Sequence, residues 1–85
     1  MNGTLIVVLG PITTATRFSK KLLERERISA RVVHTPEALG GGGCSYSLRT
    51  EMEVLPRVMQ IAKDFRFRVK GYYWMEGEGN YHALS

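Results

Sequence analysis

An unbroken apolar run near the start of the chain constrains the fold more than any other feature of the sequence. Residues 4–9, TLIVVL, are β-branched or aliphatic, and no charged residue alternates with them. Such a run is typical of a central strand that is buried on both faces of a sheet. It is shorter than the core of a signal peptide and far shorter than the roughly 20 apolar residues of a membrane span. We therefore expect a sheet with this strand inside it, and no membrane partner.

Two amphipathic segments predict helices that pack beside that sheet. The first comes directly after the apolar run, and Thr13 or Thr14 is placed to cap it. The second spans about residues 55–64, after a loose first turn at residues 51–54. Pro56 sets the start of this second helix. An earlier start would place the proline inside the helix at a cost of about 3 kcal/mol, which exceeds the contribution of about 1 kcal/mol from an N-terminal cap.

Three more segments, residues 28–34, 44–49 and 67–75, predict the remaining strands. The resulting βαββαβ order, joined by right-handed crossovers, predicts an α+β fold, the ferredoxin-like sandwich. Its four-stranded antiparallel sheet carries both helices on one face, with the first and third strands in the centre. The strand at 28–34 pairs with the strand at 44–49 as a hairpin.

The predicted domain covers residues 1–75, and residues 76–85 are expected to be a flexible C-terminal tail because they show no periodicity. A chain of 85 residues makes one domain of modest stability. The helix-free face of the sheet receives apolar residues from the first strand, and pairing with a second copy would bury them. We therefore expect a homodimer.

Charge and cysteine content narrow the class of protein. The net charge is +4, which favours anionic partners. The single cysteine, Cys44, excludes an internal disulfide and a zinc or iron–sulfur site built from the thiolates of one subunit. A free thiol is typical of a reducing compartment, so we expect a cytoplasmic protein without a metal or cofactor.

Cys44 follows four consecutive glycines, at the end of the loop that joins the two hairpin strands. The backbone N–H groups of Gly42 and Gly43 are free of side chains and can gather as an anion-binding nest beside a thiolate. Two plainer interpretations stay open. The glycines form a flexible hairpin tip, or the cysteine is a small buried side chain on the same strand face as Tyr46.

Four side chains near the loop are further candidates for stabilising a thiolate or a bound oxyanion. They are His34, Ser45, Ser47 and Arg49. Because the ends of the loop must meet, His34 comes within reach of Cys44; otherwise it is an ordinary residue at a strand end. A metal held by Cys44 and His34 of two subunits lacks further ligands at fitting spacing, so we predict none.

The span VVHTPEALGGGGCSYSLR, residues 32–49, resembles the signature of a family of small selenium/sulfur carrier-like proteins. Four short motifs match that signature in order. They are Thr35-Pro36, Gly43-Cys44, Ser47-Leu48-Arg49 and Gly71-Tyr72-Tyr73. The similarity covers about residues 4–75, and its most specific part runs from the Thr-Pro pair to the Leu-Arg pair.

The resemblance implies that Cys44 is the functional residue. It would hold sulfur or selenium as a persulfide or selenosulfide and hand the atom to a partner enzyme. Arg49 would carry over as a positive charge near that cysteine. Such a protein is a stoichiometric carrier between donor and acceptor proteins, without catalytic turnover of its own.

Two other classes of function remain open at this point. A binding module for single-stranded RNA would use a basic and aromatic strand on the helix-free face, at an edge of the sheet. The residues that share one strand parity there are Arg66, Arg68, Lys70, Tyr72 and Trp74. The usual glycine–aromatic signatures of RNA-recognition sheets are missing from the central strands. In the other class, the domain binds a small ligand at the seam between two copies.

Overall fold

The computed structural model describes residues 3–77 and 79–84 of the chain. Within these residues the chain forms five β-strands and two α-helices. In chain order they are β1 (Thr4–Gly10), α1 (Ile12–Glu26), β2 (Arg31–His34), β3 (Tyr46–Glu51), α2 (Leu55–Asp64), β4 (Gly71–Glu76) and β5 (Asn80–Leu84). Two short 3-10 turns, η1 (Glu37–Leu39) and η2 (Met52–Val54), precede β3 and α2.

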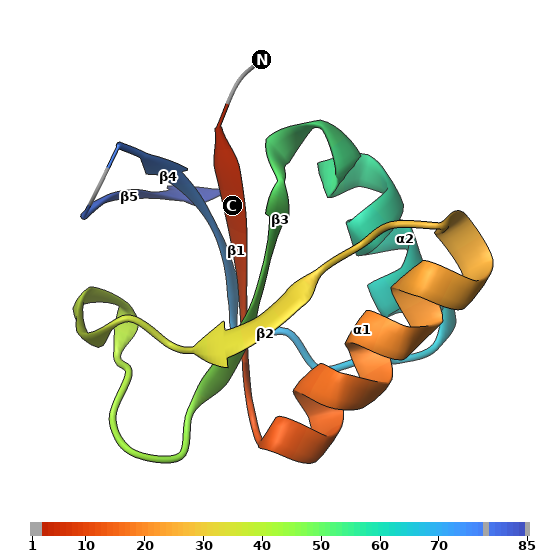
Figure 1. The fold of residues 1–85 in the computed structure, drawn as a ribbon, viewed down its shortest axis with the longest axis horizontal. Helices are drawn as coiled ribbons and strands as arrows, with labels where there is room; N and C mark the ends of the chain where they lie inside the picture. The colour runs from red at the N-terminus through yellow and green to blue at the C-terminus, as the bar shows by residue number, and fades with distance from the viewer. Residues whose placement is uncertain (1–2, 78, 85) are drawn as a thin grey trace.

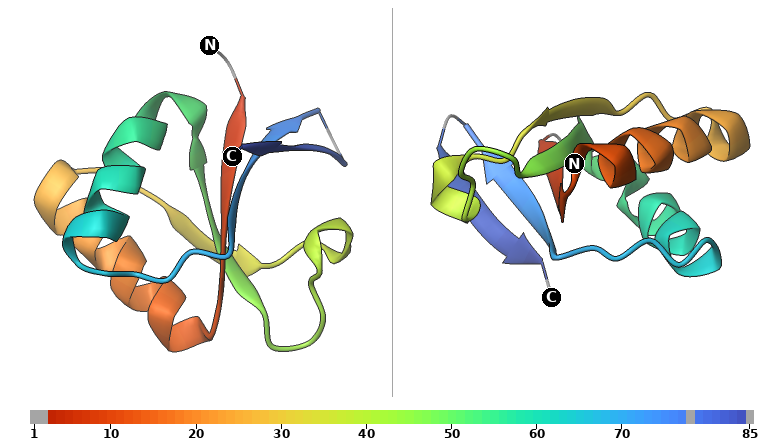
Figure 2. Two further views of the ribbon diagram at one scale, coloured as in Figure 1. Left: turned by 180° about the vertical axis from the view of Figure 1, so that it is seen from behind. Right: turned by 90° about the horizontal axis from the view of Figure 1, so that it is seen from below.

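The strands form one antiparallel sheet in the order β2-β3-β1-β4-β5 (Figure 1). β1 lies in the middle, paired with β3 on one side and with β4 on the other, because its apolar run leaves no polar face for solvent. Both helices cover one face of the sheet, and the β2–β3 loop lies on the other side (Figures 1 and 2). The predicted α+β class, the βαββαβ order and the central position of the first and third strands are confirmed.

The predicted number of four strands is wrong, because β5 lies within residues 76–85, where we expected a flexible tail. β5 pairs with β4 from its first residue to its last. Gly77 and Gly79 have φ values of 65° and 88°, a left-handed conformation that glycine adopts at little cost in tight reversals. A five-residue strand of mixed exposure gives a weak sequence signal, and pairing with β4 supplies the rest of its stability.

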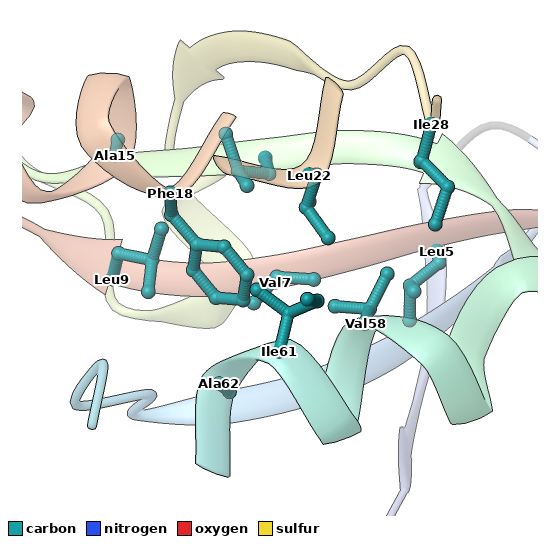
Figure 3. Packing of buried hydrophobic residues seen from close by; sticks show 11 residues of the cluster. Leu5, Val7, Leu9, Ala15, Phe18, Leu22, Ile28, Val58, Ile61 and Ala62 are labelled. Carbon is teal, nitrogen blue, oxygen red and sulfur yellow. The ribbon is translucent and has the colours of Figure 1, made fainter. Parts of the chain in front are cut away.

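The main hydrophobic core lies between the sheet and the two helices (Figure 3). β1 directs Leu5, Val7 and Leu9 into this core, and Phe18 of α1 and Val58 of α2 pack against them. All five side chains are at most 2% exposed, so each contributes about 1.5–3 kcal/mol through apolar burial. This core explains why both helices lie on the same face.

A second cluster covers the helix-free face of β1. Ile6 and Val8 point to this side and are 2% and 5% exposed. Leu39 of the β2–β3 loop, together with Tyr73 and Tyr81 of the β4–β5 hairpin, packs over them. The predicted burial of β1 on both faces is confirmed, but residues of the same chain provide the cover. The apolar residues that led us to expect a homodimer are therefore already buried, and the homodimer stays a prediction.

The helix ends follow from the local sequence with one correction. Neither Thr13 nor Thr14 caps α1, because both lie inside the helix and Pro11 takes the cap position. α2 begins at Leu55 with Pro56 in its first turn, as predicted, and η2 forms the loose turn before it. Neither helix in the described part of the chain has the length and apolar character that a membrane crossing requires.

Candidate functional site

A loop joins β2 to β3 (Figure 1). Cys44 belongs to this loop. The N–H of Thr35 donates to the carbonyl of Ser45 at 2.9 Å and closes this loop at its neck. Cys44 stands directly outside the neck, in a turn, and it is free and exposed. The interpretation of a buried cysteine is wrong, because strand alternation applies only from Tyr46, the first residue of β3.

Three of the four consecutive glycines are required by the shape of this loop, and the first of them, Gly40, has a left-handed φ of 84°. A Cβ on Gly41 would overlap the carbonyl group of Thr35, and the Gly41 N–H donates to the carbonyl of Pro36 at 3.0 Å. Gly43, next to the cysteine, has a φ of 57°, in the left-handed region that favours glycine. Gly42, by contrast, has open space where a side chain would stand. The glycine run therefore shapes a particular loop and does more than loosen the hairpin tip.

The backbone donors next to the thiol differ from those on the other side of the loop. On the far side, N–H groups donate to the carbonyls of Pro36 and Glu37 at 2.9–3.0 Å. Among the described residues, no backbone carbonyl accepts from the N–H groups of Gly42, Gly43 or Cys44. Such donors are available to water or to an anion.

Three hydroxyl groups form a hydrogen-bonded cluster at the base of the loop. Ser45 Oγ donates to Thr35 Oγ1 at 2.9 Å, and Thr35 Oγ1 lies 2.6 Å from Ser47 Oγ. Thr35 is 6% exposed and Ser47 is fully buried. The cluster ties Ser45, the neighbour of Cys44, to the sheet and so fixes the base of the loop.

Thr35 is the residue of this site that sequence reasoning missed. As the residue before Pro36 it marks the end of a strand, and that position gives no reason to expect a side-chain contact. The contact of Thr35 could have been predicted only from the register of the β2–β3 hairpin. His34 pairs with Tyr46, so the next pair along the hairpin is Thr35 with Ser45.

His34 and Arg49 belong to the strands and not to the loop. The exposed His34 ring packs against the ring of Tyr46, with centroids 4.7 Å apart. Arg49 pairs with Ile6 of β1 and lies three residues beyond Tyr46, about 10 Å along β3 at the usual strand rise. The predicted glycines and serines thus gather at the loop, whereas Arg49 lies farther along the sheet.

The basic and aromatic strand expected for RNA binding is arranged differently in the structure. β4 begins only at Gly71, after the three basic residues of that set. Trp74 pairs with Leu5, and Tyr72 packs against the main core, so both rings lie on the helix-bearing side. β4 is also flanked by β1 and β5 and is not an edge strand. The predicted RNA-binding strand is therefore wrong.

The surroundings of Cys44 are open. Three hollows in the described surface are lined by residues of the helix-bearing side, and none of these three is lined by a residue of the β2–β3 loop. Nor do three His, Cys, Asp or Glu side chains of the described chain come together as metal ligands. An exposed thiol outside these three hollows is accessible to a large partner, whereas small substrates are usually bound in concave sites.

These features define a small α+β protein that presents a single exposed thiol on a loop shaped by glycine. Over residues 4–74 the chain matches the family described as "Putative Se/S carrier protein-like", and it belongs to that family. The family membership inferred from the sequence motifs is thereby confirmed. Comparisons with curated proteins and with solved structures gave no match.

Proposed function

We propose that the protein carries sulfur or selenium on the Sγ of Cys44. The Cys44 thiolate attacks the outer sulfur of a donor persulfide, so that a new S–S bond forms at Cys44 while the S–S bond of the donor breaks. The donor leaves as a thiolate, and the exchange needs no external oxidant or reductant. An acceptor nucleophile then takes the outer atom and releases the Cys44 thiolate. An outer selenium atom moves by the same two displacements.

One observation carries this proposal: the only cysteine of the chain is exposed at the mouth of a loop whose shape depends on glycine. Exposure is required, because a donor protein and an acceptor protein must each reach the same sulfur atom. The absence of a second cysteine from the sequence also suits a carrier, since no resolving thiol can convert the loaded form to an internal disulfide.

The amides at the loop mouth support the stabilisation of a persulfide or selenosulfide anion. The N–H groups of Gly42, Gly43 and Cys44 have no backbone acceptor within the described chain. Hydrogen bonds to a charged acceptor are roughly twice as strong as those between neutral groups. Ser45 and Ser47 have a different role in this proposal, because their hydroxyls are engaged with Thr35 and hold the loop in position.

Arg49 acts at longer range in this proposal. It is exposed on the strand that follows the loop, on the same face as Ser47. Because Arg49 lies beyond Tyr46 as seen from the thiol, its exposed charge is largely screened there at physiological salt, so Arg49 guides an anionic partner surface more than it binds the sulfur. His34 flanks the loop through its packing on Tyr46.

The partners that this chemistry requires are a sulfur or selenium donor protein and an acceptor protein. A lone exposed thiol persists in a reducing compartment, and we therefore place the protein in the cytoplasm. The homodimer stays a prediction, and the edge strands β2 and β5 are the places where the sheets of two copies could pair.

Intact-mass spectrometry tests the proposal. The protein is incubated with a polysulfide or with a selenosulfide (RS–Se⁻), whose outer atom is already bonded to sulfur, and it is measured with and without a reductant. We expect the wild-type protein to gain the mass of one sulfur or selenium atom, and the reductant to remove it. Cys44→Ser should gain nothing, whereas Gly42→Ala, a change beside the thiol in open space, should load like wild type. No adduct on wild type, or equal loading of Cys44→Ser, would exclude the carrier.

A further inference from the structure

Two adjoining hollows are lined by residues of α1 and of the connection from α2 to β4. Their volumes are about 330 and 230 Å³, and Arg17, Phe65 and Phe67 line both of them. We call the joined hollow the α1 groove. No residue of the Cys44 loop lines it, so it is separate from the thiol site.

Positive charge dominates the lining of the α1 groove. Its cations are Arg17, Lys20, Lys21, Arg66 and Arg68, and its carboxylate is Glu24. Lys21 Nζ lies 3.9 Å from Glu24 Oε1, a long and exposed ion pair that contributes little. Most of the cationic charge in the groove therefore stays available to an anionic ligand.

Two phenylalanine rings contribute the aromatic part of the groove. Phe67 stacks on the buried Phe18, with ring centroids 4.5 Å apart, so its position is fixed by the core. Phe65 is 36% exposed, and its ring centroid lies 4.7 Å from Lys21 Nζ and 5.2 Å from Arg25 Cζ. Lys21 and Arg25 lie over the ring of Phe65, so a base that stacks there displaces one of these flexible cationic side chains and keeps its charge nearby.

We propose that the α1 groove binds a nucleotide, with the base against Phe65 and the phosphates against the arginines. The guanidinium groups of Arg17, Arg66 and Arg68 suit phosphate, because each presents a planar fork of donors to two oxygens. Stacking on an aromatic ring adds affinity for any base. The ligand class is thus a nucleoside phosphate, free or as a unit of single-stranded nucleic acid.

An acidic protein surface is the alternative that also matches the charge of the groove. Stable contacts between proteins are broad, with about 800 Å² buried on each partner. The α1 groove is instead concave and has aromatic rings among its cations, as is typical of small-ligand sites. The shape and the rings therefore favour the nucleotide, and an acidic peptide becomes a competing probe in the test.

Arg66 offers a variant that removes charge without disturbing the backbone. Its φ is 56°, a left-handed conformation at the end of α2 that Asn adopts more readily than most residues. Arg66→Asn therefore keeps the helix end and removes one guanidinium from the groove. Arg31→Gln is the matched control, because Arg31 is exposed on β2, outside the groove, and its replacement removes the same charge.

Isothermal titration calorimetry of the full chain at low salt tests the proposal. The probes are ATP, inorganic triphosphate, adenosine, a short oligoadenylate and an acidic peptide. We expect ATP to bind more tightly than either triphosphate or adenosine alone. Arg66→Asn should weaken ATP binding about fivefold or more, whereas Arg31→Gln should change it less than about twofold. Cys44→Ser should bind like wild type, because the groove does not use the thiol.

Several outcomes would overturn the proposal. If triphosphate binds as tightly as ATP, the base makes no contact and the groove is only a basic surface. Equal losses in Arg66→Asn and Arg31→Gln would show non-specific attraction, and a tighter acidic peptide would identify a protein-docking site. The proposal has two supported forms, and the affinities of ATP and oligoadenylate distinguish them. Tighter binding of ATP identifies a free nucleotide as the ligand, and tighter binding of oligoadenylate identifies single-stranded nucleic acid.

Discussion

The hydroxyl oxygens of Thr35 and Ser47 lie 2.6 Å apart, and both residues are buried. This contact joins the end of β2 to the start of β3, next to the hydrogen bond that closes the neck of the cysteine loop. A buried hydroxyl that loses its partner costs about 1–3 kcal/mol. The contact therefore couples the stability of the hairpin to the placement of Cys44.

Replacing either hydroxyl should lower the free energy of unfolding. Thr35→Val removes the hydroxyl partner of the fully buried Ser47, and we expect a loss of about 1–3 kcal/mol. Ser47→Ala leaves Thr35 its bond from Ser45, so the loss should be about 1 kcal/mol. The double variant should lose less than the sum, because the two side chains are in contact. Urea denaturation of the four proteins measures these values, and strictly additive losses would contradict the coupling.

Adding one methyl group to adjacent glycines of the loop should have opposite results. In Gly41→Ala the new Cβ overlaps the carbonyl of Thr35, so the loop must rearrange, and we expect a loss of about 1–3 kcal/mol. Gly42→Ala places its Cβ in open space, and stability should change by less than about 0.5 kcal/mol. Thermal unfolding of both variants provides the comparison. If the two variants were equally stable, the loop would be flexible, and the prediction of a defined loop shape would be contradicted.

Truncating Tyr81 should test whether β5 stabilises the domain. Tyr81 packs on the cluster of Ile6, Val8 and Met75, so Tyr81→Ala should cost about 1–2 kcal/mol. Asn80→Ala, an exposed change in the same strand, should cost less than about 0.5 kcal/mol. Urea denaturation distinguishes the two variants. If these residues belonged to a flexible tail, neither variant would change stability. That result would contradict the pairing of β5 with β4.

Burial raises the pKa of Tyr72 above its ordinary value of 10.0. The unfolded chain therefore loses this proton at a lower pH than the folded protein. The contribution of the neutral phenol to stability is fully present below pH 10.0 and is lost as the pH rises through the folded-state pKa. From about pH 10 to 12, Tyr72→Phe should lose less stability than wild type. Urea denaturation at each pH measures the difference, and parallel pH profiles would refute it.

Local patterns account for the part of the fold that the sequence predicts. The apolar run of β1 marks a strand buried on both sides, and Pro56 marks the start of α2. Both signals depend on neighbours along the chain, so they can be read without the fold. β5 has no such signal, because five residues of mixed exposure become a strand only beside β4.

The candidate site also has a part that the sequence predicts and a part that only the structure shows. Cys44 is identifiable from its motif and from its place after the glycines. Strand alternation would bury it beside Tyr46, but the turn at Gly43 interrupts the alternation and exposes the thiol. The role of Thr35 depends on hairpin register, which places its hydroxyl between those of Ser45 and Ser47.

The sequence by itself determined the order of the elements, the central strand and the cysteine, because spacing and residue type are properties of the chain. Only the tertiary structure decided which side chains meet. Leu39 covers Ile6 and Val8, which lie far from it in the sequence, and Arg17 of α1 lines the same hollow as Arg66, which follows α2. Contacts of this kind depend on sheet register and on helix packing, and both are set by the core as a whole.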